Sequence, residues 1–347
     1  MSSVISPGNL VWAGFEGTTV PEYMKNHLKN GNLGGIVLFS RNFTTALSLR
    51  NLTDELRSLW NGEGVLPIAI DQEGGRVRRL SWVNWPSAYS MSTIEDSNDI
   101  FHIGAAMAEE LLTLGMNVDF APVLDLHNPA SKVLGDRCFS QDEKLVVEKA
   151  EAWIDGAKST GLSVCGKHFP GHGCVHQDSH EEKPVCDLPF SDMQSHLYPF
   201  ERLHSKLDII MVAHVLYRGL DSDRVATFSS KILSLPAQWG YEGILMSDDL
   251  EMGALREFDA GEIAFRSLKS GMESLIICRS ETMLSKVISA LNSVFESNSD
   301  TSEKLMKLTE KVVKWRGRLT ESYRDFSTEN YTNMISDNNF MLEKLLS

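Results

Sequence analysis

Eight short apolar runs alternate along this chain with longer amphipathic stretches. Each run is continuously apolar, which is typical of parallel strands covered on both faces. The runs span residues 10–15, 35–40, 66–71, 118–124, 162–168, 209–214, 243–247 and 275–278. Stretches with helical spacing include 46–59, 100–114, 143–159, 190–204, 262–269 and 281–295. This rhythm predicts an α/β fold, a single (β/α)8 TIM-type barrel, with room for one irregular or reversed strand.

The barrel is expected to occupy residues 1–325, because 347 residues suffice for one large barrel and no second domain is evident. Residues 326–347 form a polar C-terminal tail that ends in the sequence FMLEKLL. This ending predicts a short amphipathic helix docked on the barrel, or else a frayed, partly disordered end.

Polar residues stand at the ends of several apolar runs. They are Asp71, Asp125, Lys167, His168, His214, Asp248 and Arg279. Barrel enzymes build their active sites at the carboxyl ends of the strands. The pattern therefore predicts that these side chains converge on one mouth of the barrel.

The charge and the cysteines restrict partners and compartment. A formal net charge of −14 disfavours nucleic acid and anionic membrane surfaces. No apolar run approaches the roughly 20 residues of a membrane-spanning helix, and the amino-terminal residues do not resemble a secretory signal. Cys165 and Cys278 lie in apolar runs and are expected to be reduced core residues, which fits a cytoplasmic protein. The oligomeric state stays open, with a monomer favoured.

The segment 167–180, KHFPGHGCVHQDSH, holds four histidines spaced every four residues. On a helix they would share one face and suggest a zinc site. Proline and two glycines inside the run instead favour a strand end that opens into a loop. In such a loop Asp178 and His180 can meet across one serine, and a carboxylate beside an imidazole is the arrangement of a catalytic dyad.

Four ordered motifs carry a family resemblance. They are DQEGGR at 71–76, DFAPVLD at 119–125, KHFPGHG with DSH at 167–180, and MSDDLEM at 246–252. Together they resemble family 3 glycoside hydrolases, the β-N-acetylglucosaminidases of the NagZ type. The resemblance runs from about residue 8 to about residue 320 and agrees with the barrel predicted from periodicity.

The resemblance implies a retaining exo-β-N-acetylglucosaminidase. Asp248 would be the nucleophile that forms a covalent glycosyl-enzyme, and His180, oriented by Asp178, would be the general acid/base. The sugar-binding set would be Asp71, Arg137, Lys167 and His168. The substrates would be cytoplasmic peptidoglycan fragments in which N-acetylglucosamine is linked to 1,6-anhydro-N-acetylmuramic acid, released during cell-wall recycling.

Structural roles compete for several of these residues. Asp248 could instead cap a following helix, a role that Asp249 is expected to take over if Asp248 is the nucleophile. Arg137 and Lys167 could form structural ion pairs. We expect Glu73 and Arg76 to be structural, as a buried pair across the Gly74-Gly75 turn. Further residues are assigned to the pocket wall or loop rather than to chemistry: Asp125, His172, His214 and Met252; His176 is assigned to the surface.

Three other functions stay open. A phosphorylase would use phosphate instead of water, because a histidine acid/base leaves less negative charge near the acceptor. A metal-dependent barrel hydrolase would use the histidine cluster, and a sugar-binding barrel would lack catalysis. We expect no metal and no nucleotide cofactor, because the histidine run lies in a Pro/Gly loop and no phosphate-cradling sequence is present.

Overall fold

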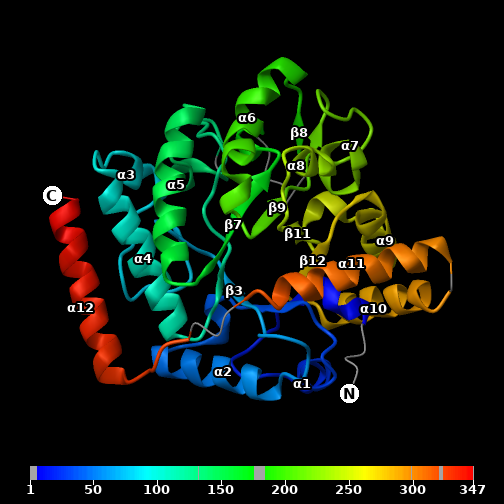
Figure 1. The fold of residues 1–347 in the computed structure, drawn as a ribbon, viewed down its shortest axis with the longest axis horizontal. Coiled ribbons are helices and arrows are strands. Elements are labelled where there is room, and N and C mark those ends of the chain that lie inside the picture. Colours follow the sequence, from blue (N-terminus) through cyan, green and yellow to red (C-terminus); the bar gives the residue numbers. More distant parts are fainter. Residues whose placement is uncertain (1–5, 132, 176–183, 298, 320–322, 347) are drawn as a thin grey trace.

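The computed structural model describes residues 6–131, 133–175, 184–297, 299–319 and 323–346 of the chain. Within these ranges eight parallel strands close into a barrel (Figure 1). Their order is β1, β2, β3, β6, β7, β9, β11 and β12, and β12 pairs back onto β1. Their bounds are Val11–Ala13, Gly35–Val37, Ile68–Ile70, Val118–Asp119, Ser163–Phe169, Ile209–Val212, Ile244–Asp249 and Ser274–Ile277. The predicted eight-stranded barrel is confirmed.

Helices surround the barrel and connect its strands (Figure 1). They are α1 Glu22–Lys29, α2 Ala46–Leu59, α3 Ala88–Ser92, α4 Ser97–Thr113, α5 Glu143–Ser159, α6 Phe190–Leu203, α7 Ser230–Leu233, α8 Leu235–Gln238, α9 Ala260–Ser270, α10 Glu281–Phe295, α11 Asp300–Arg316 and α12 Thr328–Leu345. None of the helices in the described ranges is long and apolar enough to cross a membrane.

Strand β6 is irregular, as the sequence allowed. The apolar run 118–124 contributes only Val118–Asp119 as regular strand, followed by a single bridge between Val123 and Lys167. Pro122 interrupts the run and has no backbone N–H to donate to a ladder. Asp125 follows three residues after the proline and is fully buried against His168.

The barrel interior is a packed core rather than a channel. Trp12 of β1 is fully buried there, with its ring centroid 6.0 Å from that of Phe120 and 6.3 Å from that of Trp315. Gly35 of β2 makes room for the indole, because a Cβ at this position would lie 2.6 Å from the ring of Trp12. Core side chains of the strands thus close the floor beneath the mouth.

The C-terminal residues include a helix that packs on the barrel's outer layer. Helix α12 lies along α4, and the Tyr331 hydroxyl donates a hydrogen bond of 2.9 Å to the buried Glu110 carboxylate of α4 (Figure 1). The division of the chain at residue 325 into a catalytic barrel and a tail stays a prediction.

One disulfide bond is present that no sequence motif indicates. It joins Cys174 and Cys186, whose Cα atoms are 5.6 Å apart. Cys138, Cys165 and Cys278 are free thiols. Cys165 is a buried core residue as expected, whereas Cys278 is only partly buried and lines the cavity at the mouth of the barrel, so its assignment to the core was wrong. The disulfide pair is hard to foresee because its spacing of twelve residues matches no redox signature.

Candidate active site

A cavity of about 590 Å³ opens at the carboxyl ends of the barrel strands. Its volume falls within the range of small-molecule sites. Strand ends or the residues just after them supply most of its charged lining, including Asp71, Lys167, His168 and Asp248. Of the seven polar residues predicted to converge on one mouth, five line this cavity, whereas Asp125 and His214 are buried beside it.

Lys167 links two carboxylates at the base of this cavity. Its Nζ lies 2.8 Å from Oδ1 of Asp71 and 2.6 Å from Oε1 of Glu73, and only 2% of its side chain is exposed. Burial would lower the pKa of Lys167, but Asp71 and Glu73 raise it above its ordinary value. The ammonium therefore stays charged in a dry environment, where its position is fixed by two anions.

Arg137 completes the cluster from the short 3-10 turn Gly135–Arg137. Its Nε and Nη2 atoms donate hydrogen bonds of 2.8 Å each to the two carboxylate oxygens of Glu73. Burial alone would raise the pKa of Glu73, but Arg137 and Lys167 outweigh it and lower the pKa to about 2. The bidentate geometry fixes the plane of the guanidinium group.

This arrangement corrects the expected role of Glu73. We expected a structural pair between Glu73 and Arg76 across the glycine turn. Instead Glu73 lines the cavity and binds Arg137 and Lys167, whereas Arg76 pairs with Asp136 at 3.1 Å on the surface. The turn formed by β4 Gln72–Gly74 and β5 Val77–Arg78 directs the two side chains to different partners.

Arg79 also extends the cluster. Its Nη2 lies 2.9 Å from the second oxygen of Asp71, and its guanidinium carbon is 5.4 Å from the centre of the Phe39 ring. Burial would raise the pKa of Asp71, but Lys167 and Arg79 lower it well below the ordinary range. Both Arg79 and Phe39 line the cavity and were missed from sequence; their only local signal is proximity to a strand end.

His168 is held in one orientation by Asp125. Its Nδ1 donates to Asp125 Oδ2 at 2.6 Å, and its Nε2 lies 3.3 Å from Nη2 of Arg137. The Asp125 carboxylate also accepts the backbone N–H groups of His168 at 3.2 Å and His172 at 2.6 Å. Asp125 is fully buried, so it acts by positioning the ring rather than by reaching the cavity.

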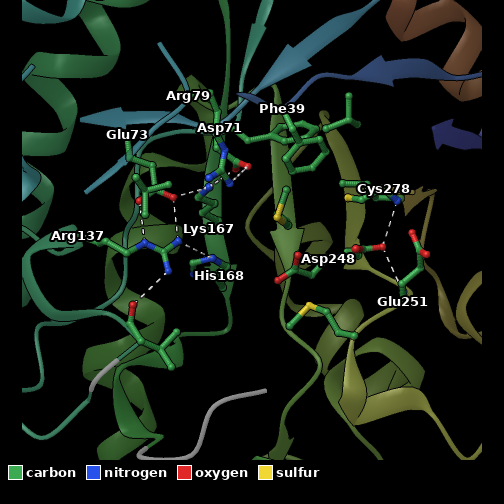
Figure 2. Close-up of a pocket in the computed structure, with 18 of the residues that line it drawn as sticks. Phe39, Asp71, Glu73, Arg79, Arg137, Lys167, His168, Asp248, Glu251 and Cys278 are labelled. Carbon is green, nitrogen blue, oxygen red and sulfur yellow. Dashed lines mark hydrogen bonds and ion pairs between the residues drawn. The ribbon is translucent and has the colours of Figure 1, made fainter. Parts of the chain in front are cut away.

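Asp248 stands on the opposite wall of the cavity, near the end of β11. Figure 2 shows it facing Lys167 and His168 across the open space. Its Oδ1 accepts the backbone N–H of Asp249 at 2.8 Å. Burial would raise the pKa of Asp248, but His168 and His214 lower it below the ordinary value. Asp248 is therefore a carboxylate at neutral pH and is available to an electrophile in the cavity.

The neighbouring Asp249 has a different task. Its Oδ1 accepts backbone N–H groups of Glu251 at 3.1 Å and Cys278 at 3.2 Å. Burial is the main cause that raises the pKa of Asp249, to about 6. The expected helix-capping role of Asp249 is therefore wrong: it lines the cavity beside Asp248, and its carboxylate ties β11 to the end of β12.

Two further histidines, His214 and His172, lie in the described part of the chain. His214 contacts Thr227 Oγ1 at 2.6 Å and the carbonyl oxygen of Asp249 at 3.1 Å, which supports the cavity wall as expected. His172 is buried, and burial is the main cause that lowers its pKa to about 4, so the ring is neutral. Asp178, His180 and His176 lie outside the described residues. Among the residues that are described, no group of three or more potential ligands could hold a metal ion.

Known proteins identify the family. The sequence model of the family described as "Glycosyl hydrolase family 3 N terminal domain" matches residues 9–315. The chain belongs to glycosyl hydrolase family 3. A β-hexosaminidase of Alkalilimnicola ehrlichii is 38% identical over 280 residues, which cover 76% of this chain and 79% of the relative.

Solved structures agree with the family assignment. NagZ from Neisseria gonorrhoeae, in complex with N-trifluoroacetyl-D-glucosamine, is 26% identical with a TM-score of 0.79 and covers 99% of both chains. A family 3 β-N-acetylglucosaminidase from Paenibacillus is 26% identical with a TM-score of 0.88; the match covers 97% of this chain and 68% of that one. This family 3 protein is a glycoside hydrolase, a β-N-acetylhexosaminidase.

Proposed function

We propose that this family 3 enzyme is a retaining exo-β-N-acetylglucosaminidase that works through a covalent glycosyl-aspartate on Asp248. The observation that supports it most is the cavity itself. An ionised carboxylate on one wall faces a cluster of paired charges on the other (Figure 2). One wall would supply the nucleophile, and the other would hold the sugar.

The sugar-binding wall would consist of Asp71, Lys167, Arg137 and His168. Each presents oxygen or nitrogen atoms that are already fixed by buried partners, so little reorganisation is needed when hydroxyl groups bind. Glu73 would act through Lys167 and Arg137, which it holds in place. The relative that binds N-trifluoroacetyl-D-glucosamine supports a 2-acetamido sugar as the ligand.

The reaction would proceed in two steps. First, Asp248 attacks the anomeric carbon while His180, oriented by Asp178, protonates the glycosidic oxygen as the bond to the aglycone breaks. Second, His180 removes a proton from water, which attacks the same carbon and releases Asp248. The configuration is retained because two inversions occur at one centre.

The proposed substrates are peptidoglycan fragments with a non-reducing N-acetylglucosamine on 1,6-anhydro-N-acetylmuramic acid, cleaved in the cytoplasm during cell-wall recycling. The likeness to NagZ over the full length of both chains supports this choice. Aryl glycosides that differ only at the sugar 2-position, N-acetyl against hydroxyl, test the sugar. Product analysis in phosphate buffer separates hydrolysis from phosphorolysis, since a phosphorylase would release a sugar 1-phosphate.

The nucleophile is tested by comparing Asp248→Ala with Asp249→Asn. Asp248→Ala is expected to lose several powers of ten in kcat because the covalent route is removed, while calorimetry still detects binding of N-acetylglucosamine. Asp249→Asn keeps an acceptor for the N–H groups of Glu251 and Cys278 and should retain most activity. Near-normal turnover in Asp248→Ala would move the nucleophile elsewhere.

The acid/base is tested by leaving-group dependence. A sugar alcohol needs protonation as it departs, whereas a nitrophenolate needs little. His180→Ala should therefore slow cleavage of a disaccharide roughly 10²–10⁴-fold and bond breaking in a nitrophenyl glycoside far less. Pre-steady-state bursts must be measured, because His180 also activates water. Asp178→Asn should give a milder defect of the same kind. Equal losses for both substrates would make His180 a structural or binding residue.

A further inference from the structure

Gln72 lies between the two carboxylates that hold Lys167, yet it does not reach the cavity. Asp71 and Glu73 both line the cavity, whereas the Gln72 side chain is fully buried and is absent from its lining. Successive side chains of an extended segment point to opposite faces. The glutamine therefore lies behind the wall that its two neighbours form.

Both ends of the Gln72 amide bind one short segment of the chain. Its Oε1 accepts the backbone N–H groups of Arg79 at 2.9 Å and Leu80 at 3.0 Å, and its Nε2 donates to the carbonyl oxygen of Leu80 at 3.1 Å. The backbone pairing of β4 with β5 is irregular, and β5 ends at Arg78. The amide thus fixes residues 79 and 80, where the strand pairing has stopped.

The main chain of Gln72 is itself anchored to the barrel. Its N–H donates a hydrogen bond of 3.0 Å to Oδ1 of Asp119, which is fully buried. Asp119 belongs to β6 and pairs with Ile70 of β3. Gln72 therefore connects two barrel strands to the segment that contains Arg79.

That segment supplies one of the two cations that orient Asp71. Nη2 of Arg79 lies 2.9 Å from Oδ2 of Asp71, and Nζ of Lys167 lies 2.8 Å from its Oδ1 (Figure 2). Lys167 is part of the barrel strand β7, whereas Arg79 follows the short β5. The place of the second cation therefore depends on the contacts of the Gln72 amide.

We propose that Gln72 is a positioning residue for the sugar-binding wall, because its amide places Arg79 on Asp71 and so gives that carboxylate one orientation toward the sugar. A misplacement of about 1 Å, caused by a change away from the reacting atoms, can lower a rate about a hundredfold. Gln72 acts through Arg79 and Asp71 and does not itself meet the substrate. The inference rests on the proposed place of Asp71 in that wall.

Gln72→Glu makes these contacts depend on a proton. The protonated acid keeps an acceptor for the two N–H groups and a donor for the carbonyl of Leu80, whereas the ionised acid turns an oxygen without a proton toward that carbonyl. Glu110, which is also buried and accepts from two neutral donors, has a pKa raised by burial to about 7. We expect a similar pKa for the introduced glutamate.

Charged groups around residue 72 act on this pKa in both directions. Asp71 and Glu73 would raise it. Among the described residues, the cations paired with those two carboxylates would lower it: Lys167, Arg79 and Arg137. Burial raises the pKa of Asp119 well above its ordinary value, so this acid stays neutral in the working range.

The experiment measures kcat/KM for a nitrophenyl glycoside of N-acetylglucosamine from pH 5 to pH 8, with urea unfolding at each pH to confirm the folded state. Each value is divided by that of the parent protein at the same pH. Gln72→Glu should match the parent within about twofold at pH 5. It should be about tenfold slower at pH 8, where an acid with a pKa of about 7 is mostly ionised.

Two further variants show whether the amide contacts cause the effect. Gln72→Met lacks both polar atoms and should be about 10–100-fold slower than the parent at every pH. Gln238→Glu, at an exposed glutamine of α8, should keep the parent value throughout. If Gln72→Met does not fold, the comparison of Gln72→Glu at two pH values still decides, because it uses one folded protein.

Two results would overturn the positioning role of Gln72. One is a ratio for folded Gln72→Glu that is the same at pH 5 and pH 8, whether high or low. The other is parent-like activity in Gln72→Met. The place of Asp71 in the wall is tested separately by Asp71→Asn: a parent-like kcat/KM there would remove Asp71 from sugar binding, whatever the Gln72 variants show.

Discussion

Two buried glutamates of this protein carry opposite pKa shifts. Glu73 in the cavity and Glu110 beneath helix α12 expose 6% and 0% of their surface. Glu73 has two cationic partners, and its pKa falls to about 2. Glu110 accepts from two neutral donors, Trp85 Nε1 at 2.6 Å and the Tyr331 hydroxyl at 2.9 Å, and burial raises its pKa to about 7. Burial alone therefore does not decide the charge state; the partners do.

The two glutamates make opposite contributions to stability against pH. Glu73 has a lowered pKa when folded, so its contribution is complete above the ordinary pKa of 4.5 and is lost as the pH falls towards 2. Glu110 has a raised pKa, so the folded state is favoured below 4.5 and loses stability as the pH rises to about 7. At neutral pH the stabilising contribution of Glu73 is thus complete, whereas ionisation of Glu110 weakens the contact between α4 and α12.

The largest effect is expected from removing the shared cation of the cavity. Lys167→Met leaves Asp71 and Glu73 facing each other with one cation fewer, and loss of one partner from a buried ion pair costs about 3–5 kcal/mol. Activity should fall with it, since both carboxylates lose their fixed positions. The pKa values of Asp71 and Glu73 should rise, so the loss should grow with pH. Urea unfolding from about pH 3, just above the lowered pKa of Glu73, to about pH 8 measures this.

Lys158→Met is the matched control for that substitution. Lys158 pairs with Asp208 at 2.8 Å, but 33% of its side chain is exposed. Its loss should cost about 1 kcal/mol or less, because exposed pairs are screened by water. If the two lysine variants lose equal stability, the cluster around Lys167 is not the strongly coupled network that its distances indicate.

A smaller effect is expected when charge is kept and shape is changed. Arg137→Lys retains a cation but cannot donate two parallel hydrogen bonds to Glu73 while contacting His168. We expect kcat/KM to fall about 10–100-fold, corresponding to about 1–3 kcal/mol. Arg76→Lys, at an exposed pair with Asp136, should change kcat/KM only a few-fold. An equal loss of kcat/KM in both variants would mean that the bidentate contact between Arg137 and Glu73 does not contribute to activity.

The contrast between these sites also marks what the sequence could predict. The strands were predictable because apolar runs are local patterns. The polar residues at their ends predicted that Asp71, Lys167, His168 and Asp248 would lie at the mouth of the barrel, and all four line the cavity there. Glu73 was misassigned because its partner Arg137 is 64 residues away, and the nearby Arg76 offered a simpler pair. No local pattern distinguishes Arg76 from Arg137 as the partner of Glu73, because the pairing depends on how β4 packs against the turn Gly135–Arg137.

Glu110 illustrates the same limit from the other direction. It occupies a helix position in 100–114, where a glutamate next to another glutamate suggests a solvated face. Glu109 does lie at the surface and pairs with Arg324 at 2.7 Å. Glu110 is buried because α12, 221 residues further on, covers it. A tertiary contact at that distance overrides what helical spacing alone indicates.

Glu110→Gln should remove the cost of ionising a buried carboxylate beneath α12. The amide keeps an acceptor for Trp85 and stays neutral at every pH, so it mimics the protonated acid. A raised pKa of this size corresponds to on the order of 2–3 kcal/mol lost between pH 4.5 and 7. The variant should match the parent protein near pH 4 and melt at a higher temperature near pH 8. Glu109→Gln, at the exposed neighbour, should show no such pH-dependent gain.

The smallest effect is expected from Tyr331→Phe, and its pH dependence carries the information. The substitution removes the hydroxyl donor but keeps the ring that packs edge-on against Trp82 at 5.8 Å. The cost should be about 1 kcal/mol when Glu110 is protonated and about 1.5–3 kcal/mol when it is ionised, because a charged acceptor strengthens the bond. The difference should therefore appear as the pH rises through about 7. Combined with Glu110→Gln, the same substitution should lose its pH dependence, since no charge can form at the acceptor. A cost of Tyr331→Phe that is constant from pH 5 to 8 would mean that Glu110 does not titrate there, and the contrast with Glu73 would then be one of position and not of charge.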